Sequence, residues 1–214
     1  MDGITGSTIE LKPNKTLKQY ALPVPHGNAL DMGIGGGRDA LYLASIGYSV
    51  TAYDITHQFA EKCNLIAREN NLDVTSHAID LLEIDIPKES FDLITSSWIL
   101  HSLKKSDSEV LLEKIVNGLK PGGMVILSLF SIDDPNFKEE LKENKEIEMN
   151  TYYSKERNSF LHHFSKEEIL SAFKSLRLIT LIEKLNLDTG HGIPHYHGII
   201  EYVGTKETII PLNV

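Results

Sequence analysis

The feature that most constrains the fold of this chain is a glycine-rich segment, DMGIGGGR, at residues 31–38. A short apolar run at residues 29–32 leads into it, and residues 38–46 follow with the apolar spacing of an amphipathic helix. Glycines between a strand and a helix can adopt positive φ angles and let the backbone approach a ligand closely. The first turn of the helix also presents backbone N–H groups that have no partner inside the helix. The segment therefore predicts a ligand-binding strand–turn–helix unit.

Strand and helix patterns continue to alternate beyond this turn. Further strands are predicted at residues 48–53, 74–79, 91–96, 124–130, 176–187 and 198–204, and further helices at 56–69, 108–119 and 165–173. The last helix begins with a capping-box pattern, in which Ser165 is the N-cap and Glu168 lies three residues on. Strands that alternate with helices form βαβ units around a mostly parallel sheet. We expect an α/β, Rossmann-like fold with seven strands and helices on both faces.

Length and composition favour a single domain. The chain has 214 residues, which suits a single domain over residues 1–214, with an N-terminal segment at 1–26. Residues 131–164 are polar and interrupt the strand–helix rhythm, so we expect them to form a lid over a substrate. The only cysteine, Cys63, excludes an internal disulfide and suits a reducing compartment.

Charge and hydropathy restrict the partners. The net charge of −9 repels nucleic-acid phosphates, so a small-molecule partner is expected rather than DNA or RNA. The first 25 residues lack the apolar core of a signal peptide, and no apolar run approaches the roughly 20 residues of a membrane helix. We expect a cytoplasmic protein that is a monomer or a homodimer and does not bind membranes.

The spacing of the glycines indicates which ligand the turn binds. A dinucleotide-binding G-x-G-x-x-G that starts at Gly33 would place its third glycine at position 38, where the chain has Arg38. A phosphate-binding P-loop would end in Gly-Lys-Ser or Gly-Lys-Thr, which is also absent from the sequence. The remaining interpretation is S-adenosylmethionine (SAM), whose ammonium Asp31 would attract. Backbone N–H groups around Gly35 and Gly37, together with Arg38, would face its carboxylate.

Further cofactor contacts are predicted at the ends of the next three strands. Asp54 ends the second strand, where an acidic residue accepts hydrogen bonds from ribose hydroxyls. Asp80 and Leu81 follow the third strand, where a carboxylate would accept the adenine amino group. Ser97 and Trp98 follow the fourth strand and would flank the adenine or the methionine part. Acidic residues at three successive strand ends are more specific than a glycine-rich turn alone.

Residues 29–54 resemble the tellurite-resistance methyltransferases, a family of class I SAM-dependent methyltransferases. The specific part is GRDALYLASIGY at residues 37–48, and the sequences FDLI (91–94) and LKPGG (119–123) match motifs shared by the whole superfamily. The resemblance covers residues 27–130 well and the C-terminal strand pair loosely. It implies SAM as the cofactor and a last strand antiparallel to the others. It also implies that the loop before that strand lies on the cofactor side of the sheet.

That loop, predicted at residues 188–197, carries His191, His195 and His197. Their imidazoles would act as general bases toward the methyl acceptor, bind a metal ion through the H-x3-H-x-H spacing, or only hydrogen-bond the backbone. We favour the general-base role and assign no metal ligand. His101, after the fourth strand, is a fourth candidate catalytic residue.

The functional hypothesis is therefore transfer of a methyl group from SAM to a small-molecule acceptor. One alternative, from the resemblance, is methylation of a metalloid oxyanion or a soft thiol or chalcogen nucleophile. Another is a SAM-binding sensor or interaction protein without catalytic activity. An NAD-dependent oxidoreductase is opposed by Arg38.

Overall fold

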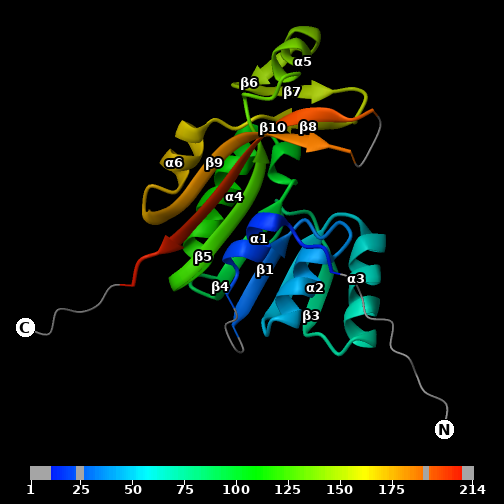
Figure 1. Cartoon of the computed structure of the whole chain (residues 1–214), viewed down its shortest axis with the longest axis vertical. Coiled ribbons are helices and arrows are strands. Elements are labelled where there is room, and N and C mark those ends of the chain that lie inside the picture. Colours follow the sequence, from blue (N-terminus) through cyan, green and yellow to red (C-terminus); the bar gives the residue numbers. More distant parts are fainter. Residues whose placement is uncertain (1–10, 23–26, 190–192, 209–214) are drawn as a thin grey trace, which may run out of the picture.

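Seven strands pair into one mixed sheet in the computed structural model, which describes residues 11–22, 27–189 and 193–208 (Figure 1). The strands are β1 (Asn28–Met32), β2 (Ser49–Asp54), β3 (Val74–Ala78), β4 (Phe91–Ser97), β5 (Leu119–Phe130), β9 (Leu176–Asp188) and β10 (His195–Lys206). Their order across the sheet is β3-β2-β1-β4-β5-β10-β9. The pairs among β1 to β5 are parallel, whereas β10 is antiparallel to both of its neighbours. The predicted Rossmann-like sheet with an antiparallel last strand is confirmed.

Helices connect these strands and cover the sheet. They are α1 (Lys15–Tyr20), α2 (Arg38–Ser45), α3 (His57–Glu69), the short 3-10 helix η1 (Leu100–Ser102), α4 (Lys105–Gly118) and α6 (Lys166–Ala172). Figure 1 shows α1, α2 and α3 together on one side of the sheet. None of the helices in the described part of the chain is long and apolar enough to cross a membrane.

Successive residues of the central strands are buried on opposite faces of the sheet, as the two-residue period of a strand requires. Leu93 and Ile126 pack with α1, α2 and α3 in one apolar cluster. Their neighbours Ile94 and Leu127 pack with α4 and α6 in another. All four side chains are at most 1% exposed. Helices on both faces, and a fourth strand buried on both sides, are thus confirmed.

Residues 131–164 form a second small unit beside the end of the main sheet. The unit contains α5 (Phe137–Glu143) and an antiparallel sheet of β6 (Glu146–Glu148), β7 (Thr151–Ser154) and β8 (Ser159–His162). Its own apolar cluster is built on Phe137, Tyr152 and Leu161. The Phe164 N–H donates to the Phe130 carbonyl of β5 and the Ser131 N–H donates to the Gly198 carbonyl of β10, both at 2.8 Å, which connects the unit to the main sheet. We call residues 131–164 the insertion.

Three predicted boundaries were wrong. The fifth strand, predicted from residue 124, begins at Leu119. The sequence pattern places His195 and His197 in a loop, but both lie in β10, because β9 continues to Asp188 and pairs with His195. The helix predicted to begin at residue 108 begins at Lys105. The helix α1 and the strands of the insertion have no counterpart among the predicted elements. These short elements are stabilised by tertiary contacts rather than by a strong periodicity of their own.

The segment before β1 is held on the sheet by Asn14. The Asn14 side-chain oxygen accepts hydrogen bonds from the backbone N–H groups of Thr16 and Leu17 and so caps α1. Its amide nitrogen donates to Ser128 Oγ of β5 at 2.8 Å, and its backbone N–H donates to Asp39 Oδ1 of α2 at 2.7 Å. Asn14 is buried, so these bonds link three elements in a site shielded from water.

We expect Asn14→Ala to lower the free energy of unfolding by about 2 kcal/mol, because it removes a helix cap and a buried side-chain hydrogen bond. Urea denaturation followed by circular dichroism measures this change. The control is Asn70→Ala at an exposed helix end, where the amide donates only to the Ile66 carbonyl and a loss under about 0.5 kcal/mol is expected. Equal losses in the two variants would contradict an anchoring role for Asn14.

Candidate active site

The glycine turn after β1 has a backbone that only glycine adopts easily. Gly33, Gly35 and Gly37 have φ angles of 94°, 48° and 78°. A Cβ on Gly33 would lie 2.8 Å from Ile99 Cβ, whereas nothing lies within 4 Å of a Cβ built on Gly35. The turn therefore packs tightly against the residues after β4 at Gly33 and faces open space at Gly35.

Asp54 fastens this turn to the end of β2. Its Oδ2 accepts a hydrogen bond from the Gly35 N–H at 3.0 Å, and its Oδ1 accepts one from the Thr56 N–H at 2.8 Å. The Gly33 N–H also donates to the Tyr53 carbonyl at 2.8 Å. Asp54 is 8% exposed, so its carboxylate is held in one orientation at the edge of the turn. Two of the predicted cofactor elements thus meet.

A cavity of about 340 Å³ opens beside Asp54. It brings together Gly33, Asp54, Asp80 and Leu81, which the sequence analysis assigned to the cofactor. Six further residues line this cavity and were not predicted from the sequence: Ile55, Ile99, Ser102, Leu103, Asn158 and Ser159. The last two belong to the insertion, which no strand-end pattern marks. We call this space the first cavity.

The carboxylate of Asp31 is buried, and the described residues offset its negative charge only in part. It is 1% exposed, and neither of its oxygens has a hydrogen-bond partner of normal geometry among the described residues. Burial and the neighbouring Asp39 carboxylate raise the pKa of Asp31 well above its usual value, although the Ala40 N–H and the Arg38 guanidinium partly oppose the shift. A positively charged ligand group beside Asp31 would supply the missing partner. The ammonium of SAM fits this environment.

A second cavity, of about 500 Å³, lies on the other side of the residues that follow β4. It is lined by Arg38, Trp98, His101, Phe130, Arg157, Asn186, Leu187, Asp188, Thr189, His197 and Ile199. Trp98 has a φ of 63°, which is unusual for a residue with a bulky side chain, and its N–H donates to the Ser128 carbonyl at 3.0 Å. Strained backbone of this kind is common at ligand sites. Because Trp98 lines this cavity and Ile99 lines the first, the two cavities share a wall.

Aromatic rings converge on Phe130 in the second cavity. The ring centroids of His101 and His197 lie 4.1 and 4.8 Å from that of Phe130, and the rings of Trp98 and His163 lie within 6 Å. Burial, with smaller effects of Arg157 and other histidines, lowers the pKa of His101 to about 3. Its imidazole is therefore neutral and weakly basic near pH 7. This environment makes His101 a weaker candidate for a general base than the sequence analysis supposed.

His197 has the hydrogen-bonding environment of an oriented base. Its Nδ1 lies 2.9 Å from Asp134 Oδ2, and Asp134 also accepts hydrogen bonds from the backbone N–H groups of Gly198 and Asn136. The carboxylate therefore fixes the Nδ1–H tautomer, and Nε2 keeps its lone pair. Asp134 was missed as a functional residue. The signal in the sequence was Gly198, since a Cβ there would lie 2.3 Å from the Asp134 N.

His195 lies next to His197 on the same face of β10. The two Nε2 atoms are 2.9 Å apart, and His195 Nδ1 is 2.9 Å from the Ile193 carbonyl oxygen. The third predicted histidine of this region, His191, lies outside the described residues. Ser97 is half-buried at the end of β4 and does not line either cavity within the described parts of the chain.

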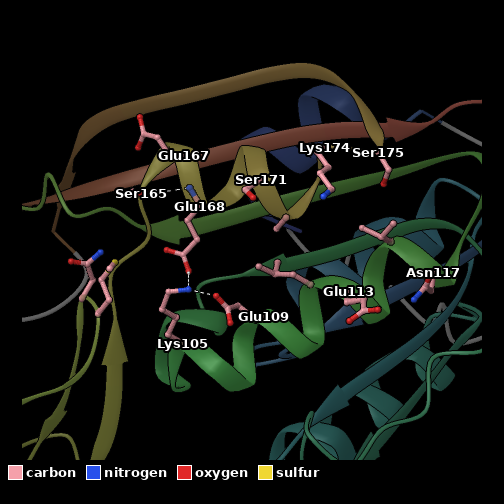
Figure 2. Close-up of a pocket in the computed structure, with 15 residues that line it drawn as sticks. Lys105, Glu109, Glu113, Asn117, Ser165, Glu167, Glu168, Ser171, Lys174 and Ser175 are labelled. Atoms are coloured by element: carbon pink, nitrogen blue, oxygen red, sulfur yellow. Dashed lines mark hydrogen bonds and ion pairs between the residues drawn. The ribbon is translucent and has the colours of Figure 1, made fainter.

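A wider cleft of about 680 Å³ lies between α4 and α6 (Figure 2). Figure 2 shows Lys105 joined to both Glu109 and Glu168, so its positive charge is already paired within the cleft. None of the predicted cofactor or catalytic residues in the described ranges lines it. The cleft is therefore a poor candidate for the reaction site despite its size.

Sheet order, glycine turn and strand-end acids together define a Rossmann-like α/β domain that resembles SAM-dependent methyltransferases. Comparison with known proteins agrees, since residues 30–127 match a family described as "Methyltransferase domain". A SAM-dependent methyltransferase from Methanosarcina mazei has the same fold, with a TM-score of 0.75 and 19% identity, over 92% of this chain and 100% of that one. The resemblance drawn from the sequence is confirmed.

Two curated relatives are more similar in sequence but are matched over shorter regions. Carboxy-S-adenosyl-L-methionine synthase of Vibrio vulnificus is 34% identical over 110 residues, which are 49% of this chain and 44% of that protein. A probable SAM-dependent methyltransferase of Haemophilus influenzae, TehB, is 26% identical over 130 residues, 55% of this chain and 45% of that protein. The matched region spans less than half of the length of either relative.

Asp54→Ala tests the cofactor site. Loss of the carboxylate removes two hydrogen-bond acceptors for the ribose, so we expect the affinity for S-adenosylhomocysteine to fall at least ~100-fold. Isothermal titration calorimetry measures this affinity. Asp73→Ala, an exposed acid before β3, is the control and should bind normally. Normal binding by the Asp54 variant would refute the assignment.

His163→Phe tests the cost of a buried neutral imidazole. Burial lowers the pKa of His163 to about 3, although Asp134 opposes the shift. The unfolded chain therefore takes up a proton below about pH 6.5 that the folded protein does not, and stability falls with pH. Between pH 7 and pH 5, His163→Phe should lose about 2 kcal/mol less stability than the unmodified protein in urea denaturation. His57→Phe, at an exposed position, should show the full loss, and the same loss in both variants would contradict the assignment.

Proposed function

We propose that this protein transfers a methyl group from SAM to a small-molecule acceptor bound in the second cavity. The observation that carries the proposal is the shared wall between the two cavities at Trp98 and Ile99. This wall lies beyond the carboxyl end of β4, where ligands bind in open α/β sheets. A cofactor in the first cavity and an acceptor in the second would meet at this wall.

The residues around the first cavity fit SAM. Asp31 supplies a counter-charge for an ammonium. Asp54 supplies two hydrogen-bond acceptors for ribose hydroxyls, and Asp80 and Leu81 supply a polar and an apolar contact for adenine. Arg38 lines the second cavity and is assigned to the carboxylate of SAM, Gly35 faces open space, and Gly37 supplies the positive φ before α2. Ser97 and Trp98 are assigned to the wall between donor and acceptor. Bound there, SAM would supply a methyl group on an electrophilic sulfonium.

The second cavity contains groups that can orient and deprotonate an acceptor. Asp134 orients the His197 ring through Nδ1, so His197 is the residue we assign as general base, with His195 beside it. Arg38 and Arg157 place two positive charges on this cavity in a chain of net charge −9. These charges favour an acceptor that carries an anionic group.

The insertion is proposed to cover the reaction site. Asn158, in the turn between β7 and β8, lines the first cavity, while Arg157 lines the second. A single turn therefore contacts the spaces assigned to the cofactor and to the acceptor. Such a cover would exclude water from methyl transfer.

Two related proteins suggest two more specific functions. The likeness to TehB supports methylation of a metalloid oxyanion or a soft thiol or chalcogen nucleophile, which would need no general base. The likeness to Carboxy-S-adenosyl-L-methionine synthase supports a second candidate function, formation of carboxy-SAM from SAM, and the two cavity arginines suit a carboxylate donor. We further propose that residues 1–214 act as one domain, as a monomer or homodimer in the cytoplasm.

A product assay with purified protein tests these functions. The protein is incubated with SAM and with thiols, phenols, small heterocycles, metalloid oxyanions or, as carboxyl donors, carboxylic acids, and the nucleoside products are identified by mass spectrometry. Methyl transfer yields S-adenosylhomocysteine, whereas carboxy-SAM formation yields a nucleoside heavier than SAM. Tight binding of S-adenosylhomocysteine without turnover of any acceptor would favour a sensor. Failure to bind it would refute the cofactor assignment.

His197→Gln should lower kcat about 100-fold or more with a hydroxyl or amine acceptor, because a positioned base contributes about 10² to 10⁴ to the rate. The affinity for S-adenosylhomocysteine should not change. Asp134→Asn removes the oriented acceptor for Nδ1–H and should lower kcat while shifting its pH profile. His77→Gln, exposed on β3, is the matched control and should keep kcat. Unchanged turnover in His197→Gln would rule out the general-base role.

A further inference from the structure

We propose that Asp188, His195 and His197 bind a divalent transition-metal ion at the mouth of the second cavity. One candidate ligand atom from each residue lies within 4.8 Å of the other two. The site goes beyond the proposed methyl transfer, because it follows from the positions of these three side chains on the β9–β10 pair.

The tautomer of His195 is determined by a backbone carbonyl. Its Nδ1 lies 2.9 Å from the Ile193 carbonyl oxygen, which can only accept a hydrogen bond. Nδ1 must therefore carry a proton. In the neutral imidazole, Nε2 is then unprotonated and presents a lone pair.

The tautomer of His197 is determined by a carboxylate. Nδ1 lies 2.9 Å from Asp134 Oδ2, and the same carboxylate accepts hydrogen bonds from the Gly198 N–H at 3.0 Å and the Asn136 N–H at 2.9 Å. Because backbone N–H groups donate to both of its oxygens, this carboxylate is oriented to accept the hydrogen bond from His197 Nδ1. His197 therefore also carries its proton on Nδ1 and presents an Nε2 lone pair.

These two lone pairs face each other across 2.9 Å. A cation placed between these two atoms would contact both nitrogens at once. A proton would join only the two nitrogens in a linear bond. A third donor, Asp188 Oδ2, lies 3.9 Å from His197 Nε2. Convergence of three donors favours a metal ion over a single shared proton.

The backbone holds the three donors in a fixed arrangement. Asp188 and His195 are directly opposite each other in the β9–β10 ladder, and His197 lies two residues further along the same face of β10. Ligands at about 2.0–2.1 Å from a tetrahedral zinc ion lie about 3.3 Å apart, so the observed separations need only small side-chain shifts. Asp134 and the Ile193 carbonyl act as the outer hydrogen-bond acceptors that orient metal-binding histidines in other proteins.

The donor set indicates the class of metal and its use. Two imidazoles and one carboxylate suit Zn²⁺, Fe²⁺ or Mn²⁺, and three protein ligands leave a coordination position for water or substrate. His197 lines both the second cavity and a smaller cavity of about 50 Å³ that His195 also lines. A metal ion at this site would lower the pKa of an acceptor hydroxyl or thiol bound at the open position. The metal ion would then promote deprotonation in place of the His197 Nε2.

Metal titration of the full chain tests this site. After chelator treatment and its removal, the protein is titrated with Zn²⁺ by calorimetry and with Co²⁺ by visible absorption, which reports ligand geometry. We expect one ion per chain with micromolar or tighter affinity. His195→Ala and His197→Ala should each weaken binding ~100-fold or more, and Asp134→Asn about 10-fold, as expected for an outer partner. His57→Ala, an exposed histidine on α3, should bind like the unmodified protein.

The test separates the metal site from the proposed function. S-adenosylhomocysteine binding by every variant shows that the fold and the cofactor site are intact without reference to turnover. If the unmodified chain does not bind S-adenosylhomocysteine, the proposed methyl transfer is refuted, whereas the metal-binding result remains valid. Absence of a one-to-one Co²⁺ complex, or equal affinity in His195→Ala and the unmodified protein, would overturn the metal site and support a shared proton.

Discussion

The carboxylate of Asp134 joins the parts of the molecule on which the second cavity depends. It accepts hydrogen bonds from His197, from the backbone of Gly198 in β10 and from Asn136 at the start of the insertion. These bonds fix the first turn of the insertion relative to the first residues of β10. Because Asp134 is 5% exposed, water competes little for the carboxylate. The tautomer of His197, and with it the chemistry available at its Nε2, follows from this one group.

The cofactor half of the protein was predictable from the sequence because its determinants are local. A glycine turn, an acid two residues before it and an acid at the next strand end are separated by short stretches of chain, and each occupies the end of a regular element. Asp54 and Gly35 are only 19 residues apart and meet in a direct hydrogen bond. Parallel strands place such residues at one edge of the sheet whatever the details of packing.

The acceptor half was less predictable because its contacts join distant segments. Asp134 and His197 are 63 residues apart, and no periodicity connects them. The sequence suggested histidines near the cofactor but placed them in a loop, since the polar residues at 186–197 hide the extension of the β9–β10 hairpin. His101 illustrates a second limit. Its position after β4 was found, but the burial that lowers its pKa arises from Phe130 and from the insertion, which the sequence pattern does not place.

The insertion leaves the main sheet directly after Phe130 and returns to it at Phe164, and the backbones of these two residues are hydrogen-bonded to each other. Because the two ends of the insertion lie next to each other, the length and sequence of the chain between them can change without altering the register of β5 and β10. Its apolar cluster around Phe137, Tyr152 and Leu161 is separate from the two clusters of the main sheet. In evolutionary terms, the part of the chain that contacts both cavities can diversify while the cofactor-binding scaffold is kept. Closely similar scaffolds can in this way come to serve different acceptors.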